Sequence, residues 1–214
     1  FEYRLATGTA FVAGGTALQH DSVIALCSRL QPRLLNGLNC DLNDQTWGWN
    51  EFAVRYLAND GQFRVHALHL GGNHWQLQMG NGSRVPVVTV GDAGATFERG
   101  IVAVTSAHGG LNVPAGEPHA EDLVETYIDL AEIFVGSTGL TFFAQTPGES
   151  LSGKLMNLFI AQIYDLPSID SLPTVGKAWV RAKQLYVAEV RDEKSYAEYH
   201  RKILHVATFY GLPM

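Results

Sequence analysis

Residues 101–110 read IVAVTSAHGG, and the fold class follows most directly from this stretch. The run 101–105 is the most strongly β-branched in the chain, which predicts a central parallel strand buried on both faces. The strand continues without a break into Ser106, Ala107, His108, Gly109 and Gly110. Because the carboxyl ends of parallel strands face a common crevice, this strand end is a candidate functional site.

A second strand end carries the same residue types. Residues 63–70 (FRVHALHL) form the predicted strand, and His69 is followed closely by Gly71, Gly72 and His74. If the two strands are neighbours, both ends lie at one site. A cysteine peptidase needs an imidazole near its thiolate, and glycines let backbone N–H groups approach the developing oxyanion. Neither strand end contains a cysteine. Ser106 is the only hydroxyl nucleophile at the end that follows residues 101–105.

Strand-like and helix-like segments alternate along the rest of the chain, which favours an α/β domain with a mostly parallel sheet. A further strand is expected at residues 9–13, and a hairpin beside the main sheet at residues 75–79 and 85–90. Helices are expected at residues 22–30, 47–57, 121–134, 150–164, 175–190 and 195–204, with another strand at 140–144. No repeat or linker interrupts this order, so we expect one domain over residues 1–214.

Composition excludes several classes of protein. With 214 residues, 46% of them hydrophobic and 17% charged, the chain is a folded domain with a sizeable core. A net charge of −6 without any Lys/Arg cluster argues against a nucleic-acid partner. No apolar run reaches the roughly 18 residues of a membrane span. The chain begins at Phe1 and ends inside an apolar phrase, so we expect a piece excised from a larger protein, and its ends predict no compartment.

The two cysteines, Cys27 and Cys40, are too few for a disulfide framework. We interpret both as structural thiols, because free cysteine usually behaves as a small buried hydrophobic residue. A single bridge between them stays open as the alternative.

Metal and nucleotide sites compete with the peptidase interpretation. His69, His74 and His108 could bind zinc together with Asp92 or Asp44, but no HExxH or similar spacing is present. No phosphate-binding glycine motif follows the first strand. Ser106 is a weak substitute nucleophile, because its side chain is expected to point away from that of Ala107 on an extended strand. We expect no cofactor and no metal.

The phrase at residues 103–114, AVTSAHGGLNVP, resembles the nucleophile strand of the gingipain-like cysteine peptidases. In that family a hydrophobic strand and a small residue precede Cys, His, a small residue, Gly and then Leu-Asn-Val-Pro. The matching positions are His108, Gly110, Leu111, Asn112, Val113 and Pro114, and the nucleophilic cysteine falls on Ala107. Residues 69–75 are similar to the strand end that carries the family's catalytic histidine.

The resemblance extends over about residues 5–214, with further similar phrases at 133–146, 153–159, 172–186 and 207–214. It implies a caspase-like (caspase-hemoglobinase) three-layer sandwich, in which a mostly parallel central sheet is flanked by helices and accompanied by a small β-hairpin. The turn after Thr146 is shorter than in relatives, so the wall of the substrate pocket departs from the family pattern.

The resemblance also implies a site and an activity. The activity is that of a cysteine endopeptidase with a Cys/His dyad, in which His69 is the general base and His74 is the alternative. The backbone N–H groups of Gly71 and Ala107 are the implied oxyanion donors. The residues implied to line the site are His108, Gly109 and Gly110.

Alanine at position 107 removes the attacking sulfur and leaves the backbone unchanged. An engineered inactive peptidase is the first interpretation, and a natural pseudopeptidase that binds a peptide or protein is the second. The expected partners are a polypeptide substrate and the remainder of a larger parent chain or a partner protein. By family analogy the residue before the scissile bond (P1) is expected to be basic, with Asp44, Asp92 and Glu98 as candidate acidic contacts.

Overall fold

A computed structural model describes residues 9–14, 17–34, 37–42, 50, 63–78, 86–89, 100–108, 123–130, 133–139, 151–164, 175–194 and 197–211. The order of elements along these residues alternates between strands and helices, as the sequence predicts.

The central sheet has six strands in the order β2-β1-β3-β7-β8-β9. They are β1 (Thr9–Gly14), β2 (Leu38–Leu42), β3 (Phe63–His69), β7 (Ile101–His108), β8 (Ile133–Ser137) and β9 (Ala207–Gly211). All neighbouring pairs are parallel except β8 and β9, which are antiparallel. The mostly parallel sheet expected from the β-branched run at residues 101–105 is therefore confirmed, and β7 lies inside it.

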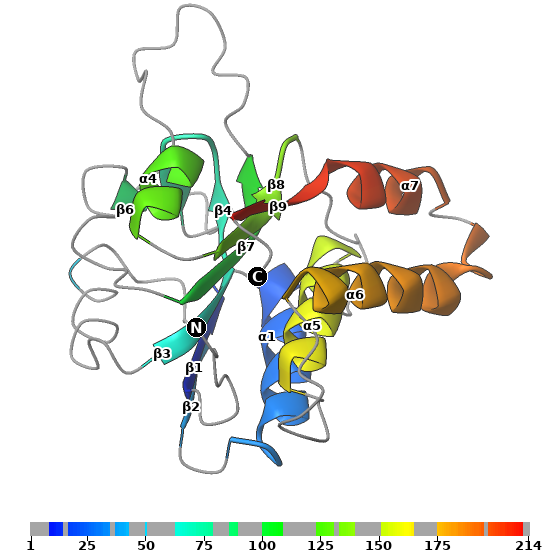
Figure 1. The fold of residues 1–214 in the computed structure, drawn as a ribbon, viewed down its shortest axis with the longest axis horizontal. Helices are drawn as coiled ribbons and strands as arrows, with labels where there is room; N and C mark the ends of the chain where they lie inside the picture. Colours follow the sequence, from blue (N-terminus) through cyan, green and yellow to red (C-terminus); the bar gives the residue numbers. More distant parts are fainter. Residues whose placement is uncertain are drawn as a thin grey trace, which may run out of the picture.

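Helices cover both faces of this sheet (Figure 1). On one face lie α1 (Ala17–Leu30), α5 (Leu151–Tyr164), α6 (Val175–Val190) and α7 (Ala197–Val206), and on the other face lies α4 (Leu123–Leu130). The side chains of strand β8 point alternately to the two faces of the sheet, so each face packs against a different helix layer. Ile133 and Val135 join the core cluster beneath α5 and α6, whereas the ring of Phe134 stacks on Tyr127 of α4 at 5.3 Å.

A second, antiparallel sheet begins directly after β3. It consists of β4 (Gly71–Gly72), β5 (Gln76–Gln78) and β6 (Pro86–Thr89). The pairing of β5 with β6 confirms the hairpin expected beside the main sheet. Residues 79–85, which join β5 to β6, lie outside the described residues.

Two segments differ from the helices predicted along the chain. Residues 121–134 were expected to be one helix, but α4 ends at Leu130 and residues 133–137 form β8. That prediction was wrong because the apolar residues Ile133, Phe134 and Val135 are buried on both faces, as a central parallel strand requires. Residues 207–211 form β9, which the pattern did not predict. The expected helix at 47–57 and strand at 140–144 lie outside the described residues, apart from residue 50.

The two cysteines form a disulfide, which corrects their interpretation as free thiols. Cys27 of α1 and Cys40 of β2 are bonded, with their Cα atoms 6.2 Å apart. Helix α1 begins at Ala17, five residues before the start expected at residue 22. The bridge links this helix to β2, which is one of the two edge strands of the central sheet.

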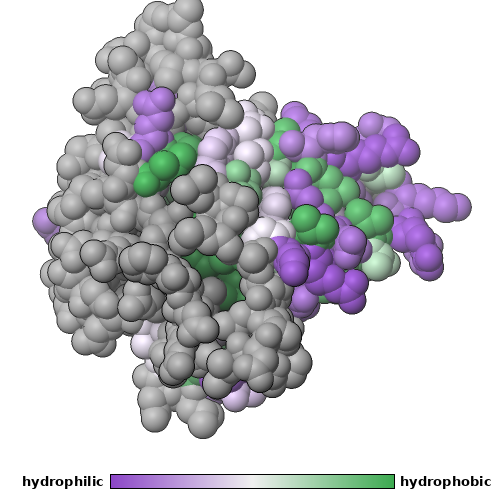
Figure 2. Space-filling view, in the orientation of Figure 1, coloured by the Kyte–Doolittle hydropathy of each residue, from purple (hydrophilic) through white to green (hydrophobic). Residues whose placement is uncertain are grey.

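The face with α6 and α7 is largely hydrophilic, with a few hydrophobic residues between the charged ones (Figure 2). Val180 and Val187 on α6 are about half exposed. Within the described ranges, no helix is both long and apolar enough to cross a bilayer.

Candidate active site

The two strand ends singled out in the sequence belong to neighbouring strands. Strands β3 and β7 pair in parallel, with His66 opposite Val102 and Leu68 opposite Val104. Both strands therefore reach the same edge of the sheet, where β3 ends at His69 and β7 continues to His108. This is the edge at which open parallel sheets place their ligands.

His69 is fully buried at the end of β3. On the strand it lies on the same face as Val65 and Ala67, which belong to the core cluster beneath α1 and α5. Burial lowers the pKa of His69 from 6.5 to about 4, and a side-chain interaction with Asn157 of α5 acts in the opposite direction. Neither ring nitrogen has a partner with hydrogen-bond geometry among the described residues. The imidazole is therefore neutral at pH 7, and its burial disfavours protonation.

The loop after His69 is held by the side chain of Asn73 and by a main-chain bond to α4. Asn73 Oδ1 accepts hydrogen bonds of 3.1 Å from the backbone nitrogens of Trp75 and Gln76, which is an Asx turn. The main-chain oxygen of His74 accepts a 2.7 Å bond from the nitrogen of Leu123, the first residue of α4. His74 is buried, and its Nε2 has no hydrogen-bond partner in the described part of the chain.

The two glycines of this loop lie in β4. Gly71 is opposite Gln78 and Gly72 is opposite Leu77 in the antiparallel ladder. A Cβ atom at position 72 would lie 2.7 Å from the main-chain oxygen of Gln76, so only glycine fits there. The backbone of Gly71, an implied oxyanion donor, thus begins the small sheet two residues after His69.

Strand β7 is irregular where it carries the implied nucleophile position. Ala103 pairs with Val135 and His108 pairs with Ser137, so residues 104–107 of β7 face the single residue Gly136 of β8. Such bulges bend a strand and change the direction of its side chains, and they are frequent next to active sites. The backbone of Ala107 and His108 belongs to β7. Their side chains and that of Ser106 are outside the described atoms, as are Gly109 and Gly110 entirely.

Within its described residues the structure gives no support to the metal-site alternative, and it does not describe the candidate acidic contacts. The described residues contain no group of three or more His, Cys, Asp or Glu side chains that could bind a metal ion. Asp44, Asp92 and Glu98, the candidate acidic contacts for a basic P1 residue, lie outside the described residues.

Two polar residues near the site were missed in the sequence. Asn157 is fully buried on α5 and donates a 2.8 Å hydrogen bond to the main-chain oxygen of Ser22 on α1. The available signal was a lone asparagine in the apolar run LMNLF at residues 155–159. Thr105 is also buried, two residues before Ala107, and only its position at the end of a strand could have drawn attention to it.

A mostly parallel sheet flanked by helices, with a small antiparallel sheet after the third central strand, is the α/β architecture that the gingipain resemblance implied, and that expectation is confirmed. Two solved structures share it. One is the crystal structure of the Arg-specific cysteine proteinase gingipain R (RgpB), with a TM-score of 0.64 and 9% sequence identity. The other is the complex of Porphyromonas gingivalis RgpB pro- and mature domains, with a TM-score of 0.61 and 11% identity.

These likenesses cover nearly all of this chain but only part of the other proteins. The match spans 96% of this chain and 46% of the first neighbour, and 97% of this chain and 48% of the second. The chain therefore spans less than half the length of the two structures it matches. No protein-family model and no curated protein matches the sequence. At this low identity the likeness shows a gingipain-type fold alone.

Proposed function

We propose that this chain is a gingipain-type peptidase domain that binds polypeptide at the carboxyl ends of β3 and β7. In its Ala107 form it cannot cleave, because the position of the nucleophile carries no sulfur. The observation that supports this proposal is the parallel pairing of β3 with β7, which brings the loop after His69 and the bulge at residues 104–107 to one edge of the sheet. A larger parent chain is part of the proposal, since the chain spans less than half of its structural neighbours.

The proposed chemistry is acyl transfer in a chain with cysteine at position 107. The thiolate attacks the scissile carbonyl carbon, and the backbone N–H groups of Gly71 and residue 107 stabilise the oxyanion. The imidazolium of His69 then protonates the leaving amine as the C–N bond breaks. Water hydrolyses the thioester and returns the thiol. His74, five residues later in the same loop, is the alternative proton donor.

His69 can act as the proton donor only when a thiolate is present beside it, because of its electrostatic environment. In the Ala107 chain, burial disfavours the charged imidazolium, which is why the pKa of His69 falls to about 4. A thiolate beside the ring favours the charged form and raises that pKa again, while the imidazolium lowers the pKa of the thiol. The dyad therefore stabilises its own ion pair, which neither partner achieves alone in this buried position.

The complete burial of His69 favours a second function, that of a pseudopeptidase. A general base must reach the substrate, and this side chain has no exposed surface in the free protein. A domain that keeps the sheet edge and the loops, but buries its histidine, is suited to bind a peptide or a partner protein without cutting it. For a cleaving domain we propose a basic P1 residue, in line with the Arg specificity of the structural neighbour.

The test uses thiol-reactive peptide probes with Arg, Lys or Asp at P1. The variants are Ala107→Cys alone and in combination with His69→Ala or His74→Ala, and the Ala107 chain is the background control. Labelling that requires both the new cysteine and His69 supports the peptidase function and reveals the P1 preference. Labelling that is lost with His74→Ala and retained with His69→Ala assigns the proton transfer to His74.

An absence of labelling with every probe, in an Ala107→Cys protein that is shown to be folded, contradicts the peptidase function. Binding is then measured by calorimetry with unreactive peptides of the same sequences and the Ala107 chain. Saturable binding supports the pseudopeptidase function, and no binding of any peptide contradicts both proposals.

A further inference from the structure

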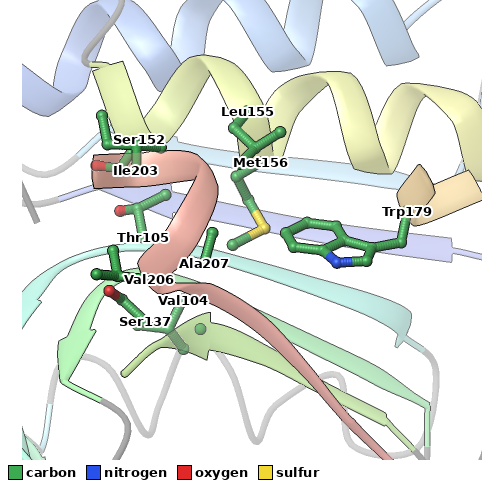
Figure 3. A pocket seen from close by; sticks show the side chains of 11 residues that line it. Val104, Thr105, Ser137, Ser152, Leu155, Met156, Trp179, Ile203, Val206 and Ala207 are labelled. Atoms are coloured by element: carbon green, nitrogen blue, oxygen red, sulfur yellow. The ribbon is translucent and has the colours of Figure 1, made fainter. Parts of the chain in front are cut away.

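A small cavity lies where the ladder between β7 and β8 is interrupted (Figure 3). Its volume is about 20 Å³, and its lining includes Val104 and Thr105 from the bulge of β7 and Gly136 and Ser137 from β8. Helices α5, α6 and α7 supply the remaining walls, together with the first residue of β9. The cavity thus lies between the irregular part of β7 and the helices that cover this face of the sheet.

The three hydroxyl side chains of the lining lie on one side of the cavity, with Ile203 and Val206 beside them (Figure 3). These hydroxyls belong to Ser152, Thr105 and Ser137, whereas Met156 and Trp179 lie on the other side. The lining contains no charged side chain. The occupant that suits this lining is therefore a small, uncharged molecule that can both donate and accept hydrogen bonds.

Thr105 is the member of this group whose hydrogen bonding is incomplete. Its side chain is 2% exposed, and Oγ1 has no hydrogen-bond partner among the described residues. A buried hydroxyl without a partner has lost its hydrogen bonds to water without replacement, so such groups are nearly always satisfied. Ser137 Oγ donates a 2.7 Å bond to the main-chain oxygen of Gly139 and accepts a 3.3 Å bond from its nitrogen, which leaves one lone pair available.

We propose that this cavity is a binding site for one water molecule, which is held by the hydroxyl of Thr105. A polar cavity holds a water when it offers at least about 10–15 Å³ and two to four hydrogen-bonding groups. The volume meets the first condition, and Thr105 Oγ1 together with the remaining lone pair of Ser137 Oγ meets the second, in a lining that is otherwise mostly apolar. The water bridges β7 and β8 at the place where their ladder of main-chain hydrogen bonds is interrupted, two residues before Ala107.

The site is tested first in the unchanged protein. A long-lived internal water gives magnetisation transfer between water and the amide protons of Thr105 and Ser137, and it appears as ordered density in a crystal structure. Transfer and density at this position support the proposal. A dry cavity in the unchanged protein overturns it, whatever the variants show.

Two substitutions separate the hydroxyl from the shape of the side chain. Thr105→Val keeps the volume and removes the hydroxyl, so the water signal is lost. Thr105→Ser keeps the hydroxyl, so the signal remains. Thr208→Val is the matched control, because Thr208 lies on β9 outside the cavity lining and its Oγ1 donates to the main-chain oxygen of Val206 at 3.2 Å. A water that persists in Thr105→Val overturns the role of this hydroxyl. None of these measurements depends on peptidase activity, so the water site can fail or stand independently of the proposed function.

Discussion

Asn157 of α5 donates a hydrogen bond of 2.8 Å from Nδ2 to the main-chain oxygen of Ser22 in α1. Both residues are fully buried, so the bond joins two helices within the layer that covers the end of β3. The same asparagine side chain interacts with His69. One polar residue thus connects the packing of the helices with the electrostatics of the candidate site.

Replacing Asn157 by leucine tests this connection. The variant keeps a similar volume but removes the hydrogen bond and places an apolar group beside His69. We expect the free energy of unfolding to fall by about 1–3 kcal/mol. We also expect the pKa of His69 to fall further, because the interaction that raises it is removed. Urea unfolding and NMR titration of His69 measure the two effects, with Gln162→Leu on the same helix as the control. An unchanged His69 titration would show that Asn157 acts on packing alone.

The buried His69 makes stability depend on pH. Its pKa is about 4 in the folded chain and 6.5 without burial, so between these values the unfolded chain binds the proton more readily. Stability is therefore fully present above pH 6.5 and decreases as the pH falls towards 4, by roughly 3 kcal/mol in total. Denaturant unfolding at a series of pH values measures this loss. His69→Leu should flatten the dependence in that window, and His205→Leu, at an exposed position on α7, should leave it unchanged.

The bridge between Cys27 and Cys40 predicts a response to reducing agents. It closes a loop over a sequence separation of 13 residues, for which the chain-entropy estimate is about 3 kcal/mol. We expect reduction to lower the free energy of unfolding by up to this amount, and we expect Cys27→Ser/Cys40→Ser to be insensitive to reductant. Urea unfolding with and without dithiothreitol measures the difference. Two reactive thiols per chain, found after unfolding without reductant, would refute the bridge.

Lys183 of α6 should contribute to stability through the end of α7. Its Nζ donates to the main-chain oxygens of Leu204 at 2.8 Å and Ala207 at 3.0 Å, and these atoms lie where α7 gives way to β9. A cation suits the carbonyl end of a helix. Lys183→Met should therefore lower the free energy of unfolding by about 2 kcal/mol, since hydrogen bonds from charged groups are the stronger ones. Thermal unfolding of this variant is compared with that of Lys194→Met, which replaces an exposed lysine. Equal losses in both variants would contradict the contribution of these two bonds.

Local patterns were sufficient for the elements with one clear periodicity. The β-branched run at residues 101–105 predicted β7, and helix α6 has the expected bounds of Val175 and Val190. Strand β8 was missed because Ile133 and Phe134 continue the apolar pattern of the preceding helix, without a glycine or proline to mark its end. Nothing in residues 207–211 indicates that they pair with β8, because that pairing is a contact between distant segments.

For the candidate site too, the features set by local sequence could be predicted and those set by contacts between distant segments could not. Its location at two neighbouring strand ends could be predicted, because the residue types and the parallel sheet rule are local information. The burial of His69 could not, because it depends on how α1 and α5 pack over the end of β3. The bulge opposite Gly136 was equally hidden, since a register shift is a property of two strands together.

The antiparallel strand β9 has a consequence for how the domain is made. Its residues 207–211 pair with β8 at residues 133–137, and helices α5, α6 and α7 lie between them in the sequence. During synthesis β8 therefore leaves the ribosome long before its partner, and its free edge stays open to pairing with other chains. We expect the newly made domain to be most prone to aggregation in this interval, and to lose that tendency once the last strand has been translated.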